Sequence, residues 1–248
     1  MIQEVKPLSA HDIIRIWELG HRMHPIERAL LILSASCSGS TRNKLASLPI
    51  GRRDALLLEI RSRIFGDGMN CFAACPKCGE KIQFTLNARN MIVKGPDEPY
   101  DIAHELSSDG LSLIFRLPDS TDQLAVVSSY SIETARLLII KQCLLQASSD
   151  GTPIATEDMQ ENAINLLCSG ILELDPGSEL LLDVTCAACR NQWQALFDIV
   201  TFFWSEISAE TRRLLLEVHN LASVYGWSES DILSMSALRR RYYLEMIG

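Results

Sequence analysis

Two pairs of cysteines have the spacing of metal ligands. Cys75 and Cys78 form one C-x-x-C sequence, and Cys186 and Cys189 form a second. Each pair lies between two segments with the residue pattern of a strand. Together they provide four thiolates, the ligand set of a tetrahedral structural Zn²⁺ with no open coordination position. The sequence therefore predicts two zinc knuckles that make one split zinc ribbon.

Redox chemistry and disulfide formation also use such cysteine pairs. A redox C-x-x-C opens a helix, whose N-terminus lowers the pKa of a thiol. Here Ile82, Phe84 and Leu86 alternate with polar residues after Cys78, which indicates a strand. Disulfides need an oxidising compartment, and residues 1–19 lack the apolar run of a signal peptide. Both alternatives stay open, but zinc is favoured.

The two knuckles differ at the residue after the second cysteine. Gly79 suits the turn expected there, whereas the second knuckle has Arg190, for which a left-handed backbone costs about 1–2 kcal/mol. Lys77, Lys81 and Arg190 bring positive charge close to the four thiolates. Cys37, Cys143 and Cys168 are expected to be core residues. Cys71, near the first knuckle, is expected to be a strand residue, and a spare metal ligand is its alternative role.

Composition narrows the class of protein. The 248 residues are 47% hydrophobic and 22% charged, as in an ordinary soluble globular protein. The net charge of −8 argues against a broad nucleic-acid surface, and no apolar run has the length of a membrane span. The chain has no phosphate-binding loop, no His-Glu-x-x-His and no G-x-S-x-G. We expect a cytoplasmic protein that is not an enzyme and has no catalytic or cofactor-binding residues other than the zinc ligands.

The elements that position the cysteines predict an α+β fold that is mainly helical. Residues 1–66 form an N-terminal helical segment, and residues 67–94 with 177–200 form the split zinc ribbon. Residues 95–176 form a folded insertion of one hairpin plus helices, and residues 201–248 form a C-terminal helical segment. The 107 residues between Cys78 and Cys186 are therefore structured.

Local signals place the elements inside these segments. A hairpin is expected from Tyr100 to Leu117 around Ser108-Asp109-Gly110. Helices are expected from Ser131 to Gln146, from Thr156 to about Leu174 and from about Asp198 to Tyr225. A further helix over 52–65 carries four arginines on one face, expected to be solvated or to bind a partner: Arg52, Arg53, Arg61 and Arg63.

The C-terminal segment is rich in aromatic residues and arginine, and these are the candidates for a partner-binding surface. An alternative function is a zinc-ribbon nucleic-acid-binding protein, in which the arginine-rich last helix contacts phosphates. The acidic chain and the apolar residues on that helix argue against this alternative. The candidate residues are Phe202, Phe203, Trp204, Trp227, Arg239, Arg240, Arg241, Tyr242 and Tyr243.

Several stretches resemble a known family. They include Trp193-Gln194-Ala195-Leu196-Phe197-Asp198-Ile199, Phe202-Phe203-Trp204-Ser205-Glu206-Ile207, Tyr225-Gly226-Trp227-Ser228 and Cys75-Pro76-Lys77-Cys78-Gly79-Glu80. The chain resembles the T-even-type phage baseplate hub assembly protein family, with relatives in contractile-tailed phages and contractile injection systems. The resemblance covers nearly the whole chain, although Cys186-Ala187-Ala188-Cys189-Arg190 lacks the usual proline and glycine.

The resemblance implies a non-enzymatic role in building or forming a baseplate or its central hub, either as an assembly chaperone or as a permanent structural protein. It implies other baseplate, hub or tail proteins as partners. With the motifs and composition above, no small-molecule substrate and no membrane are expected as partners, and the net charge argues against nucleic acid. The expected location is the cytoplasm of the bacterial host, with possible retention in the assembled particle.

Overall fold

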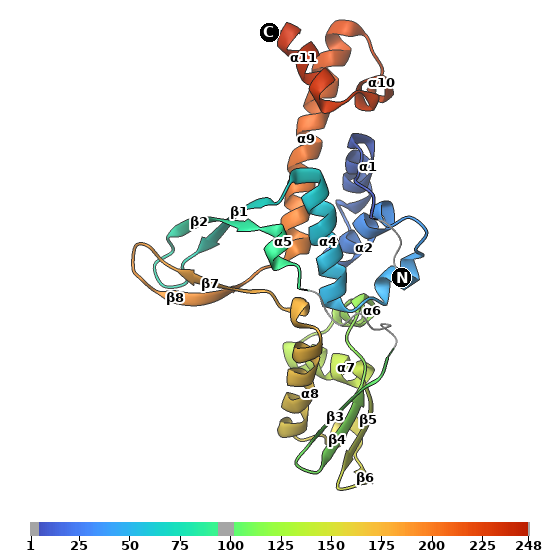
Figure 1. Cartoon of the computed structure of the whole chain (residues 1–248), viewed down its shortest axis with the longest axis vertical. Helices are drawn as coiled ribbons and strands as arrows, with labels where there is room; N and C mark the ends of the chain where they lie inside the picture. The colour runs from blue at the N-terminus through green and yellow to red at the C-terminus, as the bar shows by residue number, and fades with distance from the viewer. Residues whose placement is uncertain (1–4, 94–101, 248) are drawn as a thin grey trace. The chain divides into compact units, whose positions relative to one another are not determined.

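The computed structural model describes residues 5–93 and 102–247. It has a mixed α+β fold that is mainly helical, as predicted (Figure 1). Contacts group the chain into two compact units, residues 41–198 and residues 1–40 with 199–248. Residues 41–66, which we assigned to the N-terminal helical segment, thus belong to the same unit as the cysteine pairs.

In the unit formed by residues 1–40 and 199–248, the helices pack along α9 (Ile199–Tyr225). Contacts to it come from α1 (Ala10–Gly20), α2 (Pro25–Ser36), α10 (Glu229–Ser234) and α11 (Ala237–Ile247). The side chains of Ser9 and Ser228 accept backbone amides in capping boxes at the starts of α1 and α10. Gly226, with φ of 66°, follows the last residue of α9.

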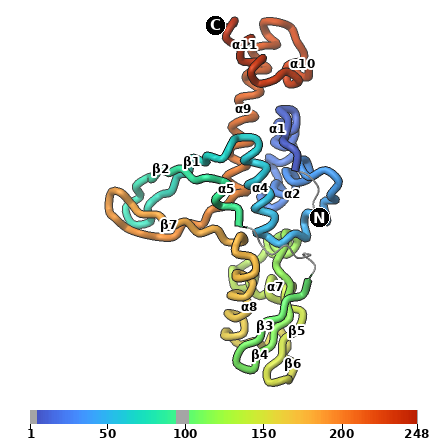
Figure 2. The backbone as a smooth tube through the Cα atoms, in the orientation of Figure 1, coloured from blue at the N-terminus to red at the C-terminus, as the bar shows by residue number. Residues whose placement is uncertain are grey.

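In the unit of residues 41–198, α3 (Arg42–Ala46) and α4 (Ile50–Phe65) come first. They are followed by the hairpin of β1 (Gly68–Ala74) and β2 (Lys81–Asn87) and the short helix α5 (Ala88–Met91). A second hairpin, β7 (Leu181–Thr185) with β8 (Gln192–Leu196), ends the unit. The tube in Figure 2 shows the two hairpins running side by side, although they belong to separate two-stranded sheets.

The insertion between the hairpins contains an antiparallel sheet in the order β3-β4-β5-β6. Its strands are β3 (His104–Ser108), β4 (Leu111–Phe115), β5 (Leu144–Ser149) and β6 (Thr152–Pro153). The segment between the hairpins also contains three helices, α6 (Ser120–Val126), α7 (Ile132–Cys143) and α8 (Glu161–Leu174). It has two 3-10 turns, η1 (Thr156–Asp158) and η2 (Pro176–Ser178). Side chains of the sheet, α7 and α8 share one core, which includes Leu113, Phe115, Ile140, Leu144 and Leu167.

The predicted hairpin around Ser108-Asp109-Gly110 is confirmed for the described residues, while its expected start at Tyr100 lies outside them. Asp109 and Gly110 both have positive φ, 49° and 80°, as a type I′ turn requires. Asp150 and Gly151 repeat this turn between β5 and β6, with φ of 48° and 80°.

Two helix boundaries were predicted wrongly. The helix after Ser131 ends at Cys143 rather than Gln146, because residues 144–149 pair with β4 as strand β5. The helix expected from Thr156 starts at Glu161, after a separate 3-10 turn. In the first case, a pairing with a distant strand overrides the local helical pattern.

The arginine face of α4 was also predicted wrongly for two of its members. Arg53 is 4% exposed and donates to Ser120 Oγ at 3.3 Å and to Gln123 Oε1 at 2.5 Å. Arg61 is 2% exposed and donates to the backbone carbonyls of Gly66 and Gly68. These two guanidinium groups join parts of the same unit, so neither can provide a partner surface.

Candidate metal centre

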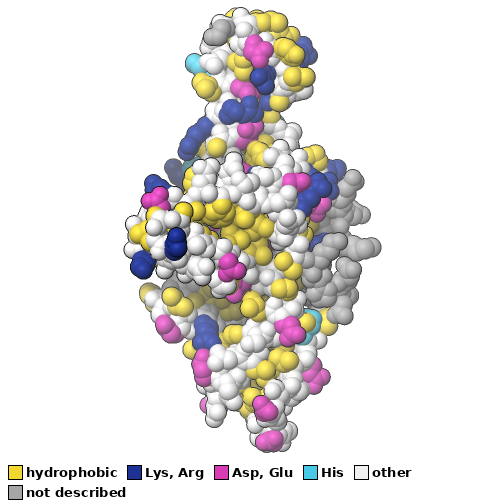
Figure 3. Space-filling view, turned by 60° about the vertical axis from the view of Figure 1, so that its left-hand side comes forward, with side chains coloured by type: hydrophobic (Ala, Val, Ile, Leu, Met, Phe, Trp, Pro, Cys, Tyr) yellow, Lys and Arg dark blue, Asp and Glu magenta, His cyan; other side chains and the backbone are white. Residues whose placement is uncertain are grey.

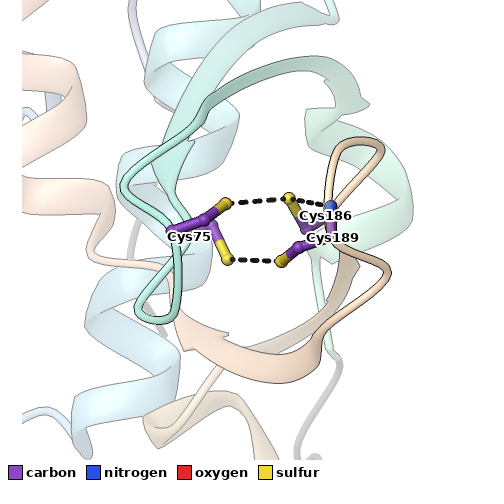
Figure 4. Close-up of side chains that lie close together, drawn as sticks. Cys75, Cys186 and Cys189 are labelled. Atoms are coloured by element: carbon purple, nitrogen blue, oxygen red, sulfur yellow. Dashed lines mark hydrogen bonds between the residues drawn. The ribbon is translucent and has the colours of Figure 1, made fainter.

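The four cysteines of the two C-x-x-C sequences lie together. Their Sγ atoms all lie within 4.8 Å of one another, although Cys78 and Cys186 are 108 positions apart in the sequence. Cys75 Sγ is 3.6 Å from Cys189 Sγ, and Cys78 Sγ is 3.6 Å from Cys186 Sγ. Figure 4 shows the sulfur atoms of the two hairpins facing one another. The predicted gathering of both pairs at one place is confirmed.

These distances fit a tetrahedral metal site. Zn–S bonds of about 2.3 Å in a regular tetrahedron give sulfur–sulfur edges of about 3.8 Å. Disulfide sulfurs would be about 2.05 Å apart, and all eight cysteines are free. Strand β2 follows the first pair where a redox C-x-x-C would open a helix. The geometry therefore favours metal coordination over both alternatives.

The two knuckles have the same backbone hydrogen bonds. In the first, the Gly79 amide donates to the Cys75 carbonyl at 2.9 Å, and the Cys75 amide donates to the Glu80 carbonyl at 2.9 Å. In the second, the Arg190 amide donates to the Cys186 carbonyl at 2.9 Å, and the Cys186 amide donates to the Asn191 carbonyl at 2.8 Å. Each hairpin turn thus holds its cysteines by one repeated pattern.

The residue after the second cysteine is left-handed in both turns, with φ of 76° at Gly79 and 60° at Arg190. The strain anticipated at Arg190 is therefore present, because a side chain disfavours this conformation. The absence of glycine has not changed the shape of the turn. The backbone hydrogen bonds of the knuckle and the sulfur cluster it supports are sufficient to hold Arg190 in place.

The sulfurs differ in environment. Cys75 and Cys186 are buried, Cys189 is half-buried and Cys78 is exposed. Burial raises the pKa of the Cys75 thiol, but the amides of Cys78 and Lys77 and the neighbouring thiols outweigh this and lower it to about 7. The Glu80 amide lowers the pKa of Cys78, but Cys189, desolvation and the other thiols outweigh it and raise it to about 12. In the absence of a cation, the raised pKa of Cys78 therefore limits how many thiols of the cluster are ionised.

The other cysteines do not join this cluster. Cys71 is buried in β1, and its thiol contacts the Met69 carbonyl oxygen at 3.7 Å. Cys37 and Cys143 are buried elsewhere. Cys168 was expected in the core but is exposed on α8. Among the described residues, only the four knuckle cysteines form a group with metal-ligand geometry.

The nine C-terminal candidates for a partner surface separate into interior, half-buried and exposed residues. Phe203 is 0% exposed and Arg240 is 3% exposed. Both are interior residues, so they cannot form part of the partner-binding surface for which they were candidates. Arg240 pairs with Glu217 at 2.8 Å and donates to the Met235 carbonyl at 2.6 Å. Because this guanidinium is already paired inside the protein, the three arginines do not form the exposed cluster that the alternative nucleic-acid-binding function needs.

Three further candidates have internal contacts and are half-buried. The Arg28 guanidinium lies over the Trp204 ring, 4.4 Å from the centroid of the ring. Trp227 and Tyr243 pack edge to face with centroids 4.8 Å apart, and both contact Tyr225. Phe202 is also half-buried, which leaves three candidates exposed: Arg239, Arg241 and Tyr242.

No helix among the described residues is both long and apolar enough to cross a membrane. Neither a curated protein nor a solved structure is significantly similar to the chain. The model of the T4 bacteriophage base plate protein family, in contrast, matches residues 21–204. The matched region includes all four knuckle cysteines and both hairpins. The chain therefore belongs to the T4 bacteriophage base plate protein family.

Proposed function

We propose that this chain is a non-enzymatic structural component or assembly factor of the baseplate or central hub of a contractile tail or a tail-like injection system. We propose further that Cys75, Cys78, Cys186 and Cys189 hold one structural Zn²⁺. The observation that carries this proposal is the gathering of four thiols from two distant hairpins in a member of the base plate family. The work would take place in the host cytoplasm, through contacts with other tail proteins.

The metal would join two hairpins that are distant in the sequence. The hairpins β1–β2 and β7–β8 share no strand pairing, and an isolated two-stranded hairpin is marginally stable at best. A structural Zn²⁺ contributes on the order of 10 kcal/mol when its site forms only in the folded chain. A Zn²⁺ with four thiolates would thus hold residues 75–78 and 186–189 together and keep the intervening insertion anchored at both ends.

Elemental analysis of the purified chain tests the metal. We expect one zinc per chain in the wild-type protein and its loss in Cys78→Ser and Cys186→Ser. Cys168→Ser is the matched control, because Cys168 is exposed and lies outside the cluster. A wild-type chain that is fully folded and free of metal would remove the zinc from the proposal.

Affinity purification of the chain during tail assembly tests the role. We expect baseplate or hub proteins to co-purify with it, and we expect its deletion to block the formation of baseplates. Detection of the chain in finished particles distinguishes a permanent component from an assembly chaperone. Normal baseplates in its absence would contradict the proposal.

A further inference from the structure

Helix α11 carries an apolar face that its own unit does not cover. Leu238, Tyr242 and Met246 lie four residues apart, so they share one side of the helix. Their exposed fractions are 65%, 57% and 72%. The opposite side of the helix is fixed by the ion pair of Arg240 with Glu217. The apolar stripe is therefore held in a defined orientation without contributing to the core.

Grooves lie on both sides of Tyr242. The larger has a volume of about 350 Å³ and is lined by Ser236, Leu238, Arg239, Tyr242, Tyr243 and Met246. The smaller has a volume of about 200 Å³ and is lined by Leu238, Arg241, Tyr242 and Glu245. The space-filling view shows hydrophobic side chains at the surface beside basic ones over α10 and α11, at the top (Figure 3).

The two edges of the stripe differ in charge. On one edge, Arg241 is paired with Glu245 at 3.0 Å. On the other, the Arg239 guanidinium lies 5.7 Å from the Tyr243 ring centroid, and no carboxylate of the described residues pairs with it. The larger groove thus combines apolar walls with one unmatched positive charge.

We propose that this face of α11 binds an amphipathic helix of another baseplate protein. The apolar residues of that helix, spaced three and four apart, would cover Leu238, Tyr242 and Met246, as in helix-in-groove recognition. A carboxylate at its edge would pair with Arg239. That the partner is a baseplate protein rests on the proposed function. The binding surface and its preference for an apolar, acidic helix rest on the groove and its lining residues.

A second copy of the chain fits this face less well. A two-fold antiparallel pairing about Tyr242 would put the Arg239 side chains of both copies along the same edge of the contact. This pairing leaves two like charges on one edge and gives neither Arg239 a carboxylate partner, because Glu245 lies near the other edge, where Arg241 already pairs with it. An acidic partner helix removes this conflict.

Site-specific photocrosslinking in the full-length chain tests the occupant. The chain carries benzoylphenylalanine at position 242 and is produced together with the other proteins of the tail during assembly. The control position is Leu216, which is 60% exposed on α9 of the same unit. We expect Tyr242 alone to crosslink to a baseplate protein, in a peptide with apolar residues three and four apart and an acidic residue. Crosslinks between two copies, to nucleic acid, or to no protein would each overturn the inference.

Charge reversal tests the acidic edge. Arg239→Glu should weaken binding of the crosslinked protein at least tenfold, and a carboxylate→Lys change in the crosslinked peptide should restore it. Arg212→Glu is the matched control, since Arg212 is exposed on α9. If the wild-type chain and Arg239→Glu bind baseplate proteins equally well, the inference about α11 is wrong while the proposed function stands. If wild type binds no baseplate protein, the proposed function fails with it.

Discussion

The backbone amide of Gly51 donates a hydrogen bond of 2.9 Å to Asp175 Oδ2, across 124 residues of sequence. Helix α4 has no side-chain cap of its own at Pro49, so Asp175 satisfies one of its first amides. Asp175 directly follows α8 and precedes η2, shortly before β7. This bond therefore joins the start of α4 to the segment that leads into the second hairpin.

Gly51→Ala should destabilise the chain through this contact. A Cβ atom there would lie 2.1 Å from Asp175 Oδ1 and 2.7 Å from the backbone carbon of Gly177. Because the Gly177 carbon belongs to the backbone, this clash is removed only if α4 and η2 move apart. Overpacking of this kind costs about 1–3 kcal/mol. Thermal or urea unfolding measures the change. Gly68→Ala is the control, since a Cβ there meets nothing within 4 Å; equal effects of both changes would contradict the role of the contact.

Zinc affinity should rise with pH from 6 to 9. Zinc binds thiolates, so every thiol that is protonated in the metal-free chain must release a proton. With a pKa of about 12, Cys78 is protonated over this whole range, whereas Cys75, with a pKa of about 7, changes from mostly protonated to mostly ionised. Competition titration with a chelator measures the affinity, and calorimetry in buffers of different ionisation enthalpy measures the protons.

Acidification favours the protonated thiols and releases the metal, so stability that depends on zinc is lost as the pH falls. The proton of Cys78 should still be released at pH 9. An affinity that stays constant between pH 7 and 9 would show that the thiols are already ionised without metal.

The two knuckle turns should respond in opposite ways to exchange of their left-handed residue. Gly79→Arg should destabilise the zinc-loaded chain by about 1–2 kcal/mol, because it introduces a side chain at φ of 76°. Arg190→Gly should not destabilise it, since the relief of strain at φ of 60° offsets the entropy cost of glycine. Unfolding of the two variants measures both effects. A stability loss at Arg190→Gly equal to that at Gly79→Arg would mean that the arginine side chain itself stabilises the knuckle.

Thr211→Val should stabilise the unit formed by residues 1–40 and 199–248. Thr211 is 0% exposed, and its Oγ1 has no hydrogen-bond partner within the described residues. Replacing the buried hydroxyl by a methyl group of similar size removes a desolvation cost of about 1–3 kcal/mol. Thr211→Ser is the control, because it keeps the hydroxyl and deletes the methyl group; it should destabilise. A less stable valine variant would indicate that the hydroxyl has a partner in solution.

Much of the local structure was predictable because its causes are local. Ser9 and Ser228 cap their helices through side chains three residues from their partners. Asp109 and Gly110 form a hairpin turn because both tolerate positive φ. The two C-x-x-C turns between strands are also local patterns, and their spacing alone predicts the metal site.

Features that depend on distant residues were predicted poorly. Residues 144–146 continue the helical pattern in sequence, yet residues 144–149 form β5 because β4 offers hydrogen bonds to them. Arg53, Arg61 and Arg240 look like surface charges, yet each is buried with polar partners from elsewhere in its unit. Burial of a charged group depends on compensating partners, and these lie far away in sequence for Arg53 and Arg240.

The sequence by itself determined the four metal-ligand candidates, the α+β class and the resemblance to baseplate proteins. Only the tertiary structure decided that both cysteine pairs meet within 4.8 Å, that two of the three C-terminal arginines remain exposed, and that α11 displays an apolar face. The physical reason is that turns and caps are fixed by neighbours along the chain. Burial and the meeting of distant side chains are fixed by packing between elements, which no local pattern specifies.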